Sequence, residues 1–121
     1  ERLLGEALIT RKHFVDAADR IRRMGAESVV LSLGSRGATG ARAGSIVEAI
    51  PPRIDAVSPI GAGDAMAAAF VWAMSRRDDF EDALRWGVAA GTASTKLPGV
   101  TFASLEQTQE IYPHVELRAV A

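Results

Sequence analysis

The chain has 121 residues, of which 48% are hydrophobic and 24% charged, a composition typical of one globular domain. Fourteen basic and fifteen acidic residues leave a net charge of −1, which argues against nucleic-acid binding and against attachment to a membrane surface. The absence of cysteine excludes disulfides, thiolate zinc sites and cysteine nucleophiles. The longest uncharged apolar run, Ala65 to Met74, is too short to span a membrane, and no signal peptide is predicted. A cytoplasmic location is therefore expected.

The first third of the chain predicts a helix followed by a buried strand. Apolar residues recur at helical spacing between 11 and 24, with arginines off that face, so a helix is expected there. The run from Val29 to Leu33 is rich in β-branched residues. Its continuous apolarity favours a strand buried on both faces, as in parallel sheets covered by helices. Helix and buried strand together form half of an α/β repeat, which predicts an α/β fold.

The middle of the chain predicts a hairpin. Residues 38–41 and 45–50 read as two strands joined by a turn at Arg42, Ala43 and Gly44. Pro51 and Pro52 end this hairpin, and residues 54–57 are expected to be extended.

Three further helices are predicted in the second half. Residues 65–74 are apolar on every side, so this helix is expected to be buried all round. Residues 80–95 predict a second helix, with a stripe of small residues that allows close approach to its backbone. Ser104 and Gln107 form a capping-box pattern that opens the last helix, which Pro113 ends.

The strongest chemical feature is Gly61-Ala62-Gly63-Asp64, between the extended segment and a helix. Two glycines remove side-chain bulk, and the free N–H groups of a helix's first turn attract anions. Asp64 lies in the same turn, where it could accept a proton from a hydroxyl while the amides hold phosphate oxygens. The residues alone also allow a plain helix start with an acidic first turn.

A second glycine loop, Ser32–Gly37, follows the buried strand and could lie along nucleotide phosphates or form an ordinary turn. No P-loop motif is present. A dinucleotide-binding motif beginning at Gly61 would end on Met66 instead of glycine or alanine, which disfavours a dinucleotide-binding domain. Trp72 and Trp86 are interpreted as packing residues.

Three segments, in the same order, resemble the PfkB/ribokinase-like sugar kinases. Residues 60–66 with the helix after them resemble the family's C-terminal signature, residues 85–93 its next helix, and residues 32–38 its glycine loop. The resemblance is nearest to the sugar-phosphate branch: the minor 6-phosphofructokinase, 1-phosphofructokinase and tagatose-6-phosphate kinase. It implies a glycolytic type of reaction, in which ATP with magnesium phosphorylates a hydroxyl of a sugar phosphate.

The resemblance also implies residue roles. Asp64 matches the catalytic base, and Gly61, Ala62 and Gly63 match the anion hole for the transferring phosphoryl group. Val88 and Thr92 match positions near the adenine, and we expect Val88 to face the ligand rather than the core. The matching loop that lines the nucleotide comprises Ser32, Leu33, Gly34, Ser35, Arg36 and Gly37.

Members of this branch often bind a monovalent cation, here K⁺, through backbone carbonyls and a side-chain oxygen. The family usually has D-T-x-G-A-G-D, whereas this chain has Pro59 in place of the threonine, so an N–H and a hydroxyl are missing beside the predicted cation site. The matching cation positions are Ser58, Ile60, Ser94, Leu97, Gly99 and Thr101.

The resemblance implies a ribokinase-like three-layer α/β/α sandwich, of which residues 1–121 are the C-terminal nucleotide-binding part. The N-terminal half that binds the sugar phosphate has no counterpart in this sequence. We therefore expect the 121-residue chain to be inactive alone and the full-length protein to be a homodimer. The alternative is a non-catalytic nucleotide-binding or regulatory remnant of the same fold.

Overall fold

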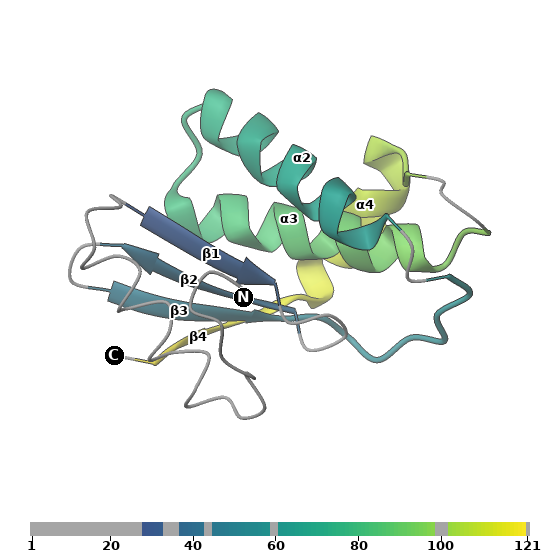
Figure 1. Cartoon of the computed structure of the whole chain (residues 1–121), viewed down its shortest axis with the longest axis horizontal. Coiled ribbons are helices and arrows are strands. Elements are labelled where there is room, and N and C mark those ends of the chain that lie inside the picture. Colours follow the sequence, from purple (N-terminus) through teal and green to yellow (C-terminus); the bar gives the residue numbers. More distant parts are fainter. Residues whose placement is uncertain (1–27, 33–36, 43–44, 59–60, 99–101, 121) are drawn as a thin grey trace, which may run out of the picture.

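The computed structural model describes residues 28–32, 37–42, 45–58, 61–98 and 102–120. They form a four-stranded sheet with helices on one face (Figure 1). The predicted helix at 11–24 lies outside the described residues. The strands follow one another across the sheet in chain order and are β1 (Ser28–Ser32), β2 (Ala38–Arg42), β3 (Ser45–Ile50) and β4 (Glu116–Ala119).

Each pair of neighbouring strands is antiparallel. Val30 pairs with Gly40, Gly40 with Val47, and Ala49 with Leu117. The predicted hairpin is confirmed as β2 and β3, whose ends meet where Arg42 pairs with Ser45. The parallel arrangement expected for the first strand is wrong within the described sheet. Only residues 33–37 join β1 to β2, and a parallel pair needs a crossover of about a dozen residues or more.

Four helical elements follow the strands of the hairpin: α2 (Ala62–Ser75), α3 (Phe80–Thr95), α4 (Leu105–Ile111) and the short 3₁₀ helix η2 (Tyr112–His114). The predicted bounds of α3 are confirmed at both ends. The predicted capping box is also present: the Ser104 Oγ accepts from the Gln107 amide at 3.1 Å, and the Gln107 Oε1 accepts from the Ser104 amide at 2.8 Å. In the described part of the chain, no helix has the length and apolarity needed to span a membrane.

The core lies between α3 and the sheet. Leu84 and Val88 of α3 pack with Ala38, Val47 and Ala49 of the central strands. At the start of the helix, Phe80 contacts β2 at Gly40, where an added Cβ would lie only 2.8 Å from the ring. The α3 helix is therefore the element that covers the sheet, and α2 lies on α3 (Figure 1).

The expectation that residues 65–74 are buried on every side is wrong. Within α2 only Ala65 and Ala73 are buried, and Val71 has 64% of its surface exposed. The helix packs along α3 instead of between two layers, so only one of its faces is covered. The helix is apolar on all sides, but the local sequence does not specify whether another element covers the side that faces away from α3.

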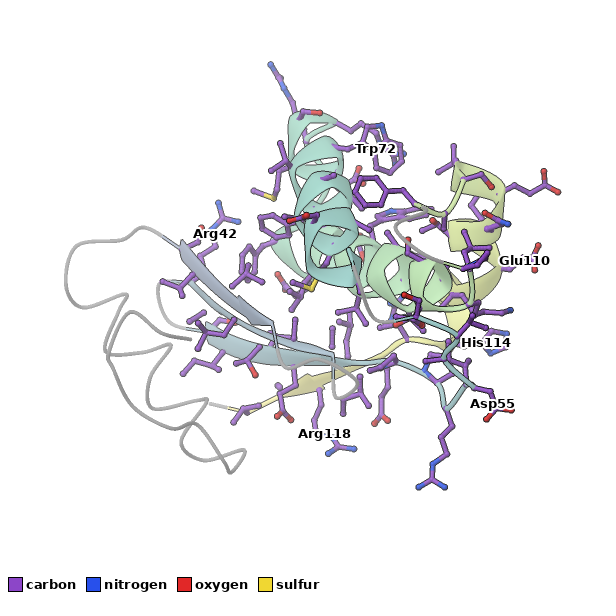
Figure 2. The ribbon with its side chains drawn as sticks, turned by 45° about the vertical axis from the view of Figure 1, so that its right-hand side comes forward. Arg42, Asp55, Trp72, Glu110, His114 and Arg118 are labelled. Carbon is purple, nitrogen blue, oxygen red and sulfur yellow. The ribbon has the colours of Figure 1, made fainter. Side chains whose placement is uncertain are left out.

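An aromatic cluster joins α2, α3 and η2 far from the glycine turn, with Trp72 near the outer end of α2 (Figure 2). The rings of Trp72 and Trp86 meet edge to face with centroids 5.4 Å apart. The ring centroids of Trp86 and Tyr112 are 4.2 Å apart. The Arg76 guanidinium lies 4.2 Å from the Trp72 ring centroid. These contacts confirm that both tryptophans are packing residues.

Candidate active site

The glycine turn forms the start of α2. Gly61 is its N-cap, with a left-handed φ of 85° that favours glycine and with no side chain to cap the helix. The first intrahelical bond runs from the Ala65 amide to the Gly61 carbonyl at 2.9 Å. The amides of Ala62, Gly63 and Asp64 therefore precede the hydrogen-bonded ladder, and amides in this position carry the partial positive charge of a helix N-terminus. The turn can hold an anion.

The space above this turn is open. A Cβ built on Gly63 meets no atom within 4 Å, and the residue is exposed. Asp64, the acidic residue of the first turn of α2, is also exposed. A carboxylate and an accessible set of amides thus occupy one turn, which is the arrangement expected for a proton acceptor beside an anion hole.

A cavity of about 430 Å³ extends from the glycine turn to the end of the hairpin. The predicted residues on its wall are Gly37, Ala62, Gly63, Val88 and Thr92. They come from three separate segments of the chain, so the fold brings the predicted phosphate and adenine positions to one cavity. Of the other predicted nucleotide residues, Ser32 ends β1, and Leu33, Gly34, Ser35 and Arg36 lie outside the described residues.

Gly37 has a structural requirement of its own. Its φ is 96°, and an added Cβ would lie 2.0 Å from the Ala49 carbonyl oxygen of β3. Glycine is needed here for the strand to pass β3, whatever the cavity binds. Gly37 is therefore required for the packing of the loop against β3, and it also lines the cavity.

The expectation that Val88 faces the ligand rather than the core is wrong. It lines the cavity, but it is only 2% exposed and belongs to the core between α3 and the sheet. Thr92, one turn later, is half-buried and lines the same cavity. Residues four apart share a helix face, but here that face passes from the core at Val88 toward the cavity at Thr92. Thr92 is thus the better probe of this wall.

The small residues of α3 have a packing role besides any role in binding. A Cβ on Gly91 would lie 3.0 Å from the Ala62 carbonyl oxygen, and one on Gly87 would lie 3.0 Å from that of Met66. These glycines let α2 approach the backbone of α3 closely. They also fix the height of the glycine turn above α3, because Gly91 contacts the first residue of α2.

The described cation positions meet at the end of α3. The amides of Val57 and Ser58 donate to the Thr95 carbonyl at 2.7 and 2.9 Å. The buried Ser94 Oγ accepts from the Ala103 amide at 2.9 Å, and the Ser94 carbonyl accepts from Leu97. The fold thus gathers the segments before α2 and after α3 at one place. Ile60, Pro59, Gly99 and Thr101 lie outside the described residues. Among the residues that are described, no three His, Asp or Glu side chains are grouped to hold a metal.

Sequence reasoning missed most of the segment between the hairpin and α2 as part of the site. Residues 54–57, which were expected to be extended, lie outside the strands of the sheet. The segment runs along the cavity, and the amides at its end donate to the Thr95 carbonyl. A pair of prolines before a glycine turn was the available signal, since prolines restrict a chain that joins two elements. The lining residues outside the predicted site are Pro51, Pro52, Arg53, Ile54, Ala56, Met66, Gly91 and Thr95.

Comparison with known proteins identifies the family. The profile of the pfkB family carbohydrate kinases matches residues 1–108. The chain belongs to the pfkB family. It is 37% identical over 90 residues to ATP-dependent 6-phosphofructokinase isozyme 2 of Escherichia coli K12, covering 74% of this chain and 29% of that protein. It is 31% identical over 114 residues to the 1-phosphofructokinase of the same strain, covering 94% of this chain and 36% of the relative.

Solved structures of E. coli phosphofructokinase-2 have the same fold as this chain. The potassium complex of E. coli phosphofructokinase-2 matches with a TM-score of 0.86 and 34% identity, over 93% of this chain and 37% of that one. A tetrameric inhibited form of the same enzyme matches with a TM-score of 0.82. The predicted α/β fold class is thereby confirmed. The chain spans about a third of the length of these relatives.

Proposed function

We propose that this chain forms the nucleotide-binding and catalytic part of an ATP-dependent kinase acting on a hydroxyl of a sugar phosphate. The single observation that carries the proposal is the shared cavity, which joins Gly37 and Thr92 to Gly63. One elongated ligand can thus reach from the predicted adenine position to the glycine turn. Family membership and relatives named as phosphofructokinases support the same reaction class.

In the proposed reaction the amides of the glycine turn bind the phosphoryl group, and Asp64 accepts the proton. The amides of Ala62 and Gly63 would hold oxygens of the γ-phosphoryl group, whose negative charge the start of α2 stabilises. As the acceptor oxygen bonds to the γ-phosphorus, its proton passes to the Asp64 carboxylate, and the bond from γ-phosphorus to the bridging oxygen breaks to release ADP. Magnesium, when it accompanies ATP, would supply positive charge that offsets part of the phosphate charge at this turn.

Two finer proposals follow from the relatives. One E. coli phosphofructokinase-2 structure holds potassium, and we propose that K⁺ binds at the end of α3, beside Ser94 and where the Ser58 amide donates to the Thr95 carbonyl. Another is tetrameric, and we propose that a protein with a complete pfkB domain is a homo-oligomer whose basic unit is a dimer.

The decisive experiment replaces Asp64 by asparagine in the complete native protein. We expect kcat to fall by at least about 100-fold, the usual effect of removing a general base, with ATP affinity unchanged within a few-fold. Glu110→Gln is the matched control, because Glu110 is an exposed carboxylate on α4, and it should leave kcat unchanged (Figure 2). Turnover like that of the native protein in Asp64→Asn would overturn the mechanism.

The 121-residue chain provides a second test. It should bind ATP at the cavity but show no sugar-dependent ATP consumption, because phosphoryl transfer requires an acceptor held beside the γ-phosphate. Sugar-stimulated hydrolysis by this chain would show that the acceptor site lies within residues 1–121. Nucleotide binding by the complete protein without any phosphoryl transfer would instead favour the non-catalytic alternative.

A further inference from the structure

Strand β4 forms one edge of the described sheet. Among the described strands it pairs only with β3, and it lies at the opposite edge from β1 (Figure 1). The Val120 amide donates to the Ile46 carbonyl at 2.8 Å, so Val120 directs its backbone groups toward β3. Because successive residues of an antiparallel strand alternate in this respect, Leu117 and Ala119 direct theirs away from β3. The outer edge of β4 therefore offers the backbone groups of Leu117 and Ala119 to another strand.

Two opposite charges lie beside this edge, on the side of the sheet that faces away from α3. Leu117 packs against the core under α3, so its neighbours Glu116 and Arg118 point to the other side, where Figure 2 shows Arg118. Their charged groups are 3.2 Å apart, and the side chains of Glu116 and Arg118 are 59% and 46% exposed. Charges that protect a sheet edge, commonly lysines, are of one sign and repel a second copy. This edge instead carries one charge of each sign.

A twofold axis makes this charge pattern self-complementary. If Leu117 pairs with Leu117 of a second copy in an antiparallel ladder, Glu116 of each copy lies directly opposite Arg118 of the other. A second register uses the same backbone groups and pairs Leu117 with Ala119, but it would place Arg118 opposite Arg118. Opposite charges across a ladder stabilise it, whereas like charges destabilise it. Charge therefore selects the register centred on Leu117.

We propose that the outer edge of β4 is a self-association surface, through which two copies join their sheets in an antiparallel β4–β4 ladder centred on Leu117. The occupant is a second copy because the same two charges satisfy both sides of the contact. The ladder does not depend on the proposed kinase function, and β4 contributes no residue to the described cavity wall, so the contact leaves the cavity open. Since β4 has only four residues, the association is reversible and increases with protein concentration.

Amide hydrogen exchange locates this contact directly. In the complete native protein, the amides of Leu117 and Ala119 should exchange at least about tenfold more slowly at high protein concentration than at low concentration, because the ladder protects them. The Val120 amide, bonded to Ile46, is the internal control and should be protected at both concentrations. Rates at 117 and 119 that do not depend on concentration would overturn the proposal. Fast rates would mean that the edge stays unpaired, and slow rates that another part of the protein covers it.

Charge changes at Glu116 test the register. Glu116→Arg would place like charges opposite each other at two positions of the ladder, so it should weaken the concentration-dependent association at least about tenfold in sedimentation equilibrium, and Glu116→Gln should weaken it less. Glu110→Arg is the matched control, because Glu110 is an exposed carboxylate on α4, in the helix layer, and it should leave association unchanged (Figure 2). Unaltered association in Glu116→Arg would overturn the proposed pairing, since in the other register Glu116 faces Val120.

A proline separates the edge from the fold. Ala119→Pro removes an N–H that faces away from β3, so it should abolish self-association while the Tm stays within a few degrees of the native value. The Tm shows whether this variant has folded, and the Glu116 variants test the same contact without any change to the backbone. A folded Ala119→Pro variant that associates like the native protein would overturn the proposal.

Discussion

Helices α2 and α3 lie against each other, but they differ in how much of each is buried. Ten residues of α3 are buried, whereas α2 buries Ala65 and Ala73 alone. The difference follows from position: α3 lies on the sheet and carries α2 on its other side, so it has neighbours on both sides (Figure 1). Among the described elements α2 packs mainly on α3, although the sequence of α2 is the more apolar of the two.

This contrast separates two kinds of apolar residue. Those of α3 stabilise the fold that the chain already has, and their replacement should change its free energy of unfolding. The exposed apolar residues of α2, Ala67, Ala68 and Val71, contribute little to that fold, and their replacement should change its free energy of unfolding much less. The glycine turn lies at the junction, since Gly91 of α3 touches Ala62 of α2.

The largest expected effect is on the α3 side. Leu84→Ala removes a side chain that is 1% exposed and packed on the sheet, so it should lower the free energy of unfolding by about 2–5 kcal/mol. Val71→Ala, at a residue of α2 that is 64% exposed, should change the free energy of unfolding by less than about 0.5 kcal/mol. Urea denaturation measures both. Similar values for the two would mean that α2 is as buried as α3.

A bulky ring placed at two successive turns of α3 should separate core from cavity. Val88→Trp overpacks the core and should cost about 1–3 kcal/mol of stability. Thr92→Trp, at the half-buried lining position, should cost less than about 1 kcal/mol and still block ATP, as measured by calorimetric titration. If Thr92→Trp binds ATP normally, the adenine does not lie on this wall.

The helix contact itself can be tightened at Gly91. In Gly91→Ala the new methyl group would lie 3.0 Å from the Ala62 carbonyl oxygen, so α2 must shift away. We expect a net loss of about 1 kcal/mol, after the gain in helix propensity, together with weaker nucleotide binding. A change that stabilises the chain and leaves binding intact would show that the two helices separate easily.

The smallest expected effect on stability is at Gly63. A Cβ there meets nothing within 4 Å, so Gly63→Ala should leave the free energy of unfolding unchanged or raise it by up to about 1 kcal/mol. The added methyl group would still narrow the approach to the amides, and ATP binding should weaken. Unaltered ATP affinity in this variant would argue against a phosphate at the turn.

Local sequence signals determined the elements whose causes are local. The strands β2 and β3 pair as the predicted hairpin, the Ser104–Gln107 capping box opens α4, and the bounds of α3 are as predicted. The glycine turn could also be predicted from the sequence, because its cause is local. Gly61 has a left-handed φ that favours glycine, and the space beside Gly63 is open. The positions of Asp64 and of the free amides in this turn could therefore be predicted together; their roles remain predictions.

Tertiary structure decided everything that depends on distant partners. The position of the final strand β4 beside β3 and the burial of Val88 depend on neighbours far along the chain. The antiparallel pairing of β1 depends on its partner β2, which the residues of β1 alone do not specify. The exposure of α2 follows because the described elements cover only one of its faces. The cavity wall at 51–56 was not predicted for the same reason, since the chain directly after it is held in place by hydrogen bonds from the Val57 and Ser58 amides to the Thr95 carbonyl of α3. Hydrophobic periodicity records that a residue prefers to be buried, but only packing determines which surface buries it.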